Sequence, residues 1–222
     1  MTDRDTARNV VLDRIRAAIA VSPPPSVVIP RDYEREPLRG SGNLTRFTGT
    51  VADYGAQVIQ IEPAEIGATV ASLVPAGQVV IPADLPPAWV DGVDGVDAVP
   101  DDPGDPLPIE RLERAAAVAT GCALGIAATG TIVLDAEEAQ GRRALTLIPD
   151  HHICVIFADQ IVDTVPQAFA ALNPAHPLTF ISGPSATSDI ELERVEGVHG
   201  PRTLDVLVVA ATHPQTAPIR PT

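Results

Sequence analysis

The sequence predicts an α/β fold in which an open, largely parallel sheet is covered on both faces, giving three layers. The strand-like runs at residues 152–157 and 204–210 are almost wholly apolar and do not alternate, and segments with helical spacing separate such runs. A continuously apolar strand is buried on both faces, and parallel strands need long connections between them, usually helices. The 222 residues, 45% of them hydrophobic, are enough to bury one core.

The N-terminal region is expected to be a separate feature. Val10, Val11, Ile15, Ala18 and Ile19 recur at mostly helical spacing within residues 3–20, and a Ser-Pro-Pro-Pro run then ends the predicted helix. We therefore expect a helix and a proline-rich arm over residues 1–41, the main domain over 42–212, and a disordered tail over 213–222.

The remaining elements follow from apolar spacing and from proline and glycine positions. Helices are predicted at residues 42–53, 63–74, 109–119 and 166–172. Strands are predicted at residues 57–61, 78–81, 125–134, 152–157, 178–181 and 204–210. Residues 82–108 are rich in proline and aspartate, so they are interpreted as a peripheral connection with a short turn at Trp89 and a strand near Val96.

The charge of the chain narrows the classes of function. Its formal net charge is −14, which disfavours binding to nucleic acid or to anionic lipid. All fifteen basic residues are arginine, so neither a P-loop lysine nor a Schiff-base lysine is available. The uncharged run at residues 115–134 is interpreted as a helix end, a turn and a buried strand, and we expect no membrane span. The charged N-terminus does not resemble a signal peptide, so a cytoplasmic location is expected.

The cysteines and histidines of the sequence do not show the number or spacing that a metal site needs. Cys122 and Cys154 are the only cysteines and lie in apolar runs, so two slowly reacting buried thiols are favoured over a redox pair, and the chain cannot supply four cysteines to an iron–sulfur cluster. None of the five histidines has the H-x-x-x-H spacing that places two ligands on one helix face. No metal site is predicted.

The most informative stretch is residues 182–202. Gly183-Pro184 ends an apolar run, Ser188 and Glu191 have capping-box spacing, and residues 197–201 form a second tight loop. A glycine turn followed by a capped helix leaves backbone N–H groups free to bind an anion. Ser185, Thr187 and Ser188 would add hydroxyl groups, and Arg202 a nearby positive charge.

Two pieces of this stretch, GPS-x-T-x-DIE and GVHGP, resemble the LUD domain of the lactate-utilization protein C family. A P-x-x-H-I element at residues 149–153 and a T-G-T element at residues 129–131 are also similar to that family, although Ala128 stands where A-E-T-G-T usually has glutamate. The resemblance implies a three-layer fold of the NagB/RpiA/CoA-transferase-like type. It also implies a role in oxidising L-lactate to pyruvate beside iron–sulfur partner proteins, with no cofactor in this chain and clusters only in those partners.

Three loops are therefore candidate ligand-binding elements, expected to meet at the carboxyl edge of the sheet. The anion-binding candidates are Thr129, Gly130, Thr131, Gly183, Ser185, Thr187, Ser188 and Arg202, and the acid–base candidates are His199, Asp189 and His152. Alternatives stay open for several of them. The T-G-T element could be only a bend in a strand, His152 a hydrogen-bonded structural residue, Asp189 a helix-dipole partner, and Arg142-Arg143 solvated charge.

Two functions from different classes fit these residues. The first is an accessory subunit in lactate oxidation that works with iron–sulfur partners and meets a small anionic metabolite. The second is a stand-alone small-molecule enzyme of the CoA-transferase or sugar-phosphate isomerase-like fold, acting on a carboxylate or phosphorylated ligand. The alanine at position 128 weakens the second, because alanine can neither attack a substrate nor move a proton.

Overall fold

A computed structural model describes residues 3–21, 28–32, 44–74, 76–90, 96–187, 195–196 and 200–210. These residues belong to two units, one containing residues 3–21 and 28–32 and the other containing the rest. The first unit holds α1 (Asp3–Val21), as its apolar spacing predicted, and Val10, Val11, Ile15 and Ile19 of this helix are exposed. No helix in the described part of the chain is long and apolar enough to cross a membrane.

The second unit is built on a six-stranded sheet in which every pair of neighbours is parallel. Across the sheet the order is β1 (Gln57–Ile61), β12 (Thr203–Val209), β7 (His151–Phe157), β4 (Ala117–Thr120), β2 (Gln78–Pro82) and β3 (Asp97–Asp101). The last strand of the described residues, β12, thus lies inside the sheet, between β1 and β7. The α/β class with a parallel sheet is as predicted.

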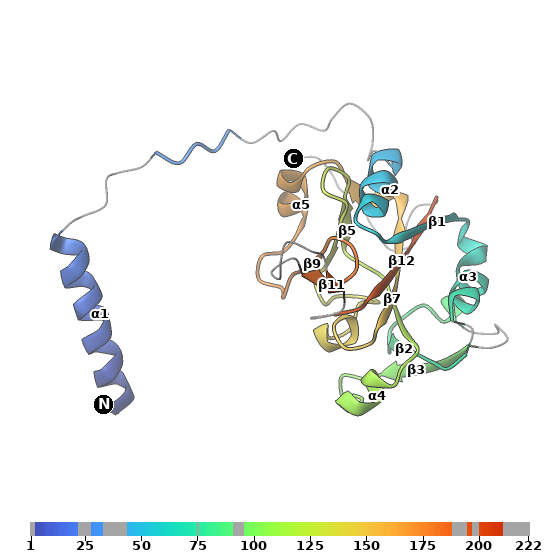
Figure 1. Ribbon diagram of the computed structural model, residues 1–222, viewed down its shortest axis with the longest axis horizontal. Helices are drawn as coiled ribbons and strands as arrows, with labels where there is room; N and C mark the ends of the chain where they lie inside the picture. Colours follow the sequence, from blue (N-terminus) through green and yellow to red (C-terminus); the bar gives the residue numbers. More distant parts are fainter. Residues whose placement is uncertain are drawn as a thin grey trace. The chain divides into compact units, whose positions relative to one another are not determined.

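Helices pack on both faces of this sheet (Figure 1). On one face, α3 (Ile66–Leu73), which follows the 3-10 turn η1 (Pro63–Glu65), packs with η2 (Pro87–Trp89) against apolar side chains of β2, β7 and β12. On the other face, Phe47 and Val51 of α2 (Leu44–Asp53) share a cluster with residues of β7 and β12. Leu112 of α4 (Ile109–Glu113) and Leu145 of η3 (Arg143–Thr146) cover β2 and β4.

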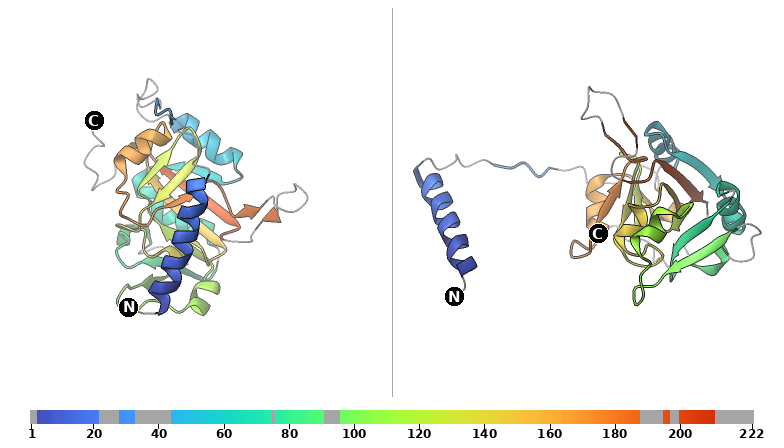
Figure 2. Two further views of the ribbon diagram at one scale, coloured as in Figure 1. Left: turned by 90° about the vertical axis from the view of Figure 1, so that its left-hand side faces the viewer. Right: turned by 60° about the horizontal axis from the view of Figure 1, so that its bottom comes forward.

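A second, four-stranded sheet lies on the α2 side. Its order is β8 (Ile161–Val162), β5 (Leu124–Ile126), β6 (Thr131–Leu134) and β9 (Thr179–Ile181), with η4 (Ala158–Gln160) leading into β8. Helix α5 (Val165–Ala171) packs on it through Ala168. A short antiparallel pair, β10 (Ala186–Thr187) and β11 (Val195–Glu196), extends from the two sheets (Figure 2). The helix predicted to begin at Ser188 lies outside the described residues.

Two predicted elements are wrong in the middle of the chain. The helix predicted at 109–119 ends at Glu113, and residues 117–120 form β4, a central strand of the main sheet. Alanine-rich sequence favours a helix by propensity, but small side chains also fit between the two packed faces of a sheet, and tertiary packing decides here. The strand predicted at 125–134 is two antiparallel strands, β5 and β6, joined by a turn at residues 127–130.

The segment 82–108 is also not peripheral. Trp89 is buried in the main core, 6.1 Å from the ring of Phe157, and Leu85 and Val90 are buried with it. Residues 97–101 form the edge strand β3, parallel to β2. The prolines and aspartates that suggested an irregular loop fit an edge position, where one side of the strand needs no hydrogen-bonded neighbour.

Candidate functional site

Residues of two of the three candidate loops line one pocket at the amino edge of the parallel sheet, and the third loop, Thr129–Thr131, contacts the pocket residue Ser182. This amino-edge pocket has a volume of about 300 Å³. His152 and Leu204, near the starts of β7 and β12, lie at its lining. The remaining lining comes from η3 and its following residue, from β9, and from the loops at 182–186 and 200–201. The expected carboxyl edge is therefore wrong for these loops.

A chain of hydroxyl groups connects the T-G-T element to this pocket. The Thr129 and Thr131 Oγ1 atoms are 2.7 Å apart, and Thr131 Oγ1 is 2.8 Å from the Oγ of Ser182, which lines the pocket. The T-G-T element is thus the turn between β5 and β6, beside the end of β9, and not a bend within a central strand.

Two glycines hold these loops close to the helix α2 and the residue that follows it. Gly130 has a φ of +57°, and a Cβ there would lie 2.7 Å from the backbone of Thr50. Gly183 has a φ of +82°, and its Cβ would lie 2.7 Å from Tyr54. Left-handed backbone and contact with a neighbouring main chain both require glycine, so these two positions fix the loops.

The next loop closes one side of the pocket. The backbone N–H of Ser185 donates to the carbonyl of Pro201 at 2.7 Å, so this donor is not free for an anion. The contact joins the GPS element to the residues that precede β12. It also shows that the free N–H groups predicted for this turn do not include that of Ser185.

His152 is the buried polar residue of the pocket. It is 1% exposed, and its Nε2 lies 2.8 Å from the Thr120 hydroxyl in β4. Burial, and secondly the neighbouring His151, lower the pKa of His152 to about 3, so the ring is neutral at pH 7. Its Nδ1 has no hydrogen-bond partner among the described residues. A neutral imidazole can donate or accept one further hydrogen bond there.

His151 points to a different partner, as expected for neighbouring residues on a strand. Its Nε2 is 2.6 Å from Oδ2 of Asp205, which is 2% exposed in β12. The two histidines therefore do not act as a pair toward one ligand.

The arginines differ in their partners. Arg142 makes two bonds to Asp101, at 2.8 and 3.0 Å, and a third to the carbonyl of Leu107, so it is a structural residue. Arg202 pairs with Asp150 on the surface, and this carboxylate raises the pKa of Arg202. Arg202 is not among the described residues that line the pocket, whereas Arg143 is. The sequence alone favours solvated charge for Arg143, and only the position of this residue in η3 connects it with the site.

Several predicted site residues cannot be placed. Ser188, Asp189 and His199 lie outside the described residues, and Thr187 is described only as part of β10. Ala128 donates its backbone N–H to the carbonyl of Asp163 at 3.0 Å, and its side chain is not among those lining the pocket.

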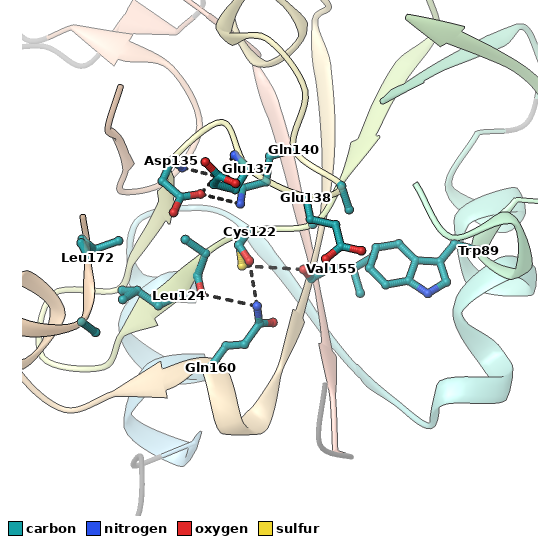
Figure 3. Close-up of a pocket in the computed structure, with 14 residues that line it drawn as sticks. Trp89, Cys122, Leu124, Asp135, Glu137, Glu138, Gln140, Val155, Gln160 and Leu172 are labelled. Atoms are coloured by element: carbon teal, nitrogen blue, oxygen red, sulfur yellow. Dashed lines mark hydrogen bonds between the residues drawn. The ribbon is translucent and has the colours of Figure 1, made fainter. Parts of the chain in front are cut away.

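A second pocket, which sequence reasoning missed, lies at the carboxyl edge of the main sheet and has a volume of about 290 Å³ (Figure 3). It lies beyond the carboxyl ends of the neighbouring strands β2 and β4. In the main sheet, the strand that follows β2 along the chain is β3, on the far side of β2 from β4, whereas β7 lies on the far side of β4, so the strand order reverses direction between β2 and β4. Such a switch point is the usual ligand crevice of an open α/β sheet. Polar residues directly after the apolar runs ending at Leu134 and Phe157 were the available signal.

This carboxyl-edge pocket is acidic. Asp135, Glu137 and Glu138 line it, no basic residue does so in the described part of the chain, and Figure 3 shows Trp89 and Leu172 on opposite sides of it. Such a lining repels anions.

The loop that forms the acidic wall is tightly constrained. Gln140 donates from Nε2 to Asp135 Oδ1 and accepts from the Asp135 N–H through Oε1, both at 2.7 Å. Ala136 and Ala139 have φ values of 60° and 59°, a left-handed conformation that costs alanine about 1–2 kcal/mol. The hydrogen bonds of this loop hold it in place despite that cost.

Both cysteines are buried near this pocket. Cys122 Sγ contacts the carbonyl of Val155 at 3.7 Å, and Cys154 Sγ contacts that of Gly121 at 3.9 Å. The Cys154 thiol, burial and the charge of Asp135 all raise the pKa of Cys122. A thiol in this environment ionises with difficulty and reacts slowly. The described residues also contain no group of three or more His, Cys, Asp and Glu side chains placed to hold a metal ion.

The fold and the motif-bearing pocket define a LUD-domain protein, and a model of the LUD domain matches residues 109–209. Lactate utilization protein C of Deinococcus radiodurans is 47% identical over 208 residues, which are 91% of this chain and 95% of that protein. The lactate utilization protein C of Anoxybacillus flavithermus is 35% identical over 104 residues, covering 46% of this chain and 47% of the relative.

Structural comparison agrees with these sequence matches. The crystal structure of a DUF162 family protein from Deinococcus radiodurans superposes with a TM-score of 0.63 at 40% identity, covering 75% of this chain and 96% of that one. The chain belongs to the lactate utilization protein C family. The family resemblance expected from residues 128–201 is confirmed.

Proposed function

We propose that this protein is an accessory subunit in the oxidation of L-lactate to pyruvate, working with iron–sulfur partner proteins. The observation that carries the proposal is the 47% identity to a lactate utilization protein C over nearly the whole length of both chains. Lactate oxidation releases two electrons that need an acceptor. The chain has two cysteines, both buried, and a typical cluster takes four thiolates, so clusters would belong to the partners.

Co-purification from the native host tests this proposal. The tagged full chain should bring down cysteine-rich, cluster-containing proteins, recognised by mass spectrometry and by their visible absorption. The purified chain alone should not reduce an artificial electron acceptor with L-lactate, whereas the complex should. Turnover by the isolated chain would contradict the accessory role, as would a host in which its deletion leaves growth on lactate unchanged.

The carboxyl-edge pocket is the one observation that favours the alternative, a stand-alone small-molecule enzyme. It occupies the switch point at which α/β enzymes bind ligands, and its wall contains the left-handed Ala136 and Ala139. Its acidic lining is unsuited to the carboxylate or phosphorylated ligands of CoA transferases and sugar-phosphate isomerases. Saturation-transfer NMR with acetyl-CoA and ribose 5-phosphate would support this alternative if either bound the purified chain.

A further inference from the structure

We propose that the amino-edge pocket is a binding site for a small carboxylate, anchored by the Arg143 guanidinium. The assignment goes beyond the accessory role, because it gives this chain a ligand of its own. The class of ligand rests on the pocket, and only the choice of 2-hydroxy and 2-oxo acids as probes rests on the proposed function.

Charge is the first argument. Arg143 is the only charged residue in the described lining of the pocket, where no aspartate or glutamate is found. Among the described residues Arg142 and Arg202 each have a carboxylate partner, but no ion pair is seen for Arg143. The chain as a whole has a net charge of −14 and repels anions. A pocket whose described lining contains an arginine and no carboxylate should instead attract them. A guanidinium binds a carboxylate through two parallel hydrogen bonds.

The buried imidazole is the second argument. His152 lines the pocket, yet its Nδ1 is left without a partner among the described residues, although it is buried. An unpaired buried nitrogen costs roughly 1–3 kcal/mol, and a hydroxyl or carbonyl group beside a carboxylate would remove that cost. Because the ring is neutral, it can meet such a group without adding charge.

The rest of the lining suits a small acid with an apolar end. Thr146 and Ser182 are lining residues that carry hydroxyl groups, and Ser182 is the last member of the hydroxyl chain that begins at Thr129. Leu147 and Phe180 provide apolar surface and are 39% and 44% exposed. A volume of about 300 Å³ is at the lower end for ligand pockets, which favours a metabolite of a few carbons over a nucleotide or a coenzyme.

Isothermal titration and ligand-observed NMR on the full chain test the assignment. The probes are L-lactate, pyruvate and lactamide, the last being an uncharged isostere of lactate. Arg143→Gln removes the proposed anchor, while Arg202→Gln is the matched control, an arginine of the same sheet edge outside the described lining. Both residues are exposed, so both variants should fold, and their melting temperatures will verify this.

Lactate or pyruvate should bind the wild type and Arg202→Gln equally, and Arg143→Gln roughly 10- to 100-fold more weakly, as expected for a charged hydrogen bond. Lactamide should bind none of them measurably. The assignment is overturned if neither acid binds the wild type, if Arg143→Gln binds as tightly, or if lactamide competes equally. None of these outcomes affects the co-purification test, so failure of the pocket and failure of the accessory role can be told apart.

Discussion

Gly130 shows how one residue without a side chain fixes the turn beside the pocket. Its φ of +57° is left-handed, and a Cβ would lie 2.7 Å from the backbone of Thr50 in α2. Gly49, one residue before Thr50, has no atom within 4 Å of its Cβ position and lies on the exposed side of the same helix.

Alanine should therefore have opposite effects at these two positions. Gly130→Ala is expected to lower the free energy of unfolding by about 2–4 kcal/mol, since it combines backbone strain with a clash against main-chain atoms that cannot move aside. Gly49→Ala should raise it by about 0.5–1 kcal/mol through helix propensity. Urea denaturation measures both. Equal effects at the two positions would show that the turn can relax away from α2.

His152 should make the protein sensitive to mild acid. Its pKa is about 3 in the folded state and about 6.5 in the unfolded state, so between these values the unfolded chain binds the extra proton. Its contribution to stability is complete above about pH 6.5 and is lost as pH falls toward 3, by up to about 1.4 kcal/mol per pH unit.

Urea unfolding at pH 7, 5.5 and 4.5 should show this loss in the wild type. His152→Gln should be less stable at pH 7, but its stability should fall less steeply with decreasing pH than that of the wild type. Parallel pH curves for the wild type and His152→Gln would mean that the pKa of this imidazole does not differ between the folded and unfolded states, which would contradict the explanation.

At the level of elements, the sequence predicted most strands correctly but placed the candidate loops at the wrong edge. Apolar runs located β2, β7 and β12, because strands inside a parallel sheet are mostly hydrophobic, and alternation located the edge strand β1. The P-x-x-H-I element, however, includes the start of β7 and does not follow its end, so His152 belongs to the amino edge. The ligand crevice at the carboxyl edge of an open α/β sheet is formed by loops that follow strands, and loops that precede strands lie at the opposite edge.

An ion pair connects β3 to Arg142, the residue that precedes η3. Asp101, 3% exposed at the end of β3, accepts two bonds from Arg142 and one from the backbone N–H of Leu107 at 2.8 Å. Sequence alone could not pair residues 41 positions apart, because such a contact depends on how the sheet is assembled.

Removing Arg142 should leave a buried carboxylate without its cation. Arg142→Ala is expected to cost about 2–4 kcal/mol, less than a fully buried pair because the arginine side chain is 36% exposed. The adjacent Arg143→Ala should change stability by less than ~0.5 kcal/mol. Chemical denaturation of both variants, and of Arg142→Ala with Asp101→Asn, checks this. Failure of the asparagine to restore any stability would contradict the explanation.

For the whole molecule, the class of fold could be predicted and the layout of the second sheet could not. The β5–β6 turn and the central strand β4 lie in one uncharged, alanine-rich run, residues 115–134, in which helix and strand patterns cannot be separated by spacing. The acidic carboxyl-edge pocket could not be predicted for a related reason. Its acidic wall follows β6 of the second sheet, and only the packing of the two sheets brings this wall to the ends of β2 and β4.

The charge of the chain should also affect its stability as a whole. With a formal net charge of −14, self-repulsion favours the expanded state at low ionic strength. Raising KCl from about 20 to about 200 mM shortens the screening length from roughly 20 to roughly 7 Å and should stabilise the fold by about 1 kcal/mol. Thermal unfolding at constant pH measures this, and a lower midpoint at high salt would mean that the surface ion pairs outweigh the repulsion.

The position of β12 has a consequence for how this protein is made. Because β12 lies between β1 and β7, the first strand of the sheet has no neighbour until residues 203–209 have left the ribosome. The sheet can close only after β12 has been synthesised, and until then β1 and β7 each present an open hydrogen-bonding edge. A nascent chain with such edges needs protection from aggregation. A nonsense mutation shortly before β12 would leave this state permanent, so the truncated product should be cleared by proteases and should not persist as a partly active fragment.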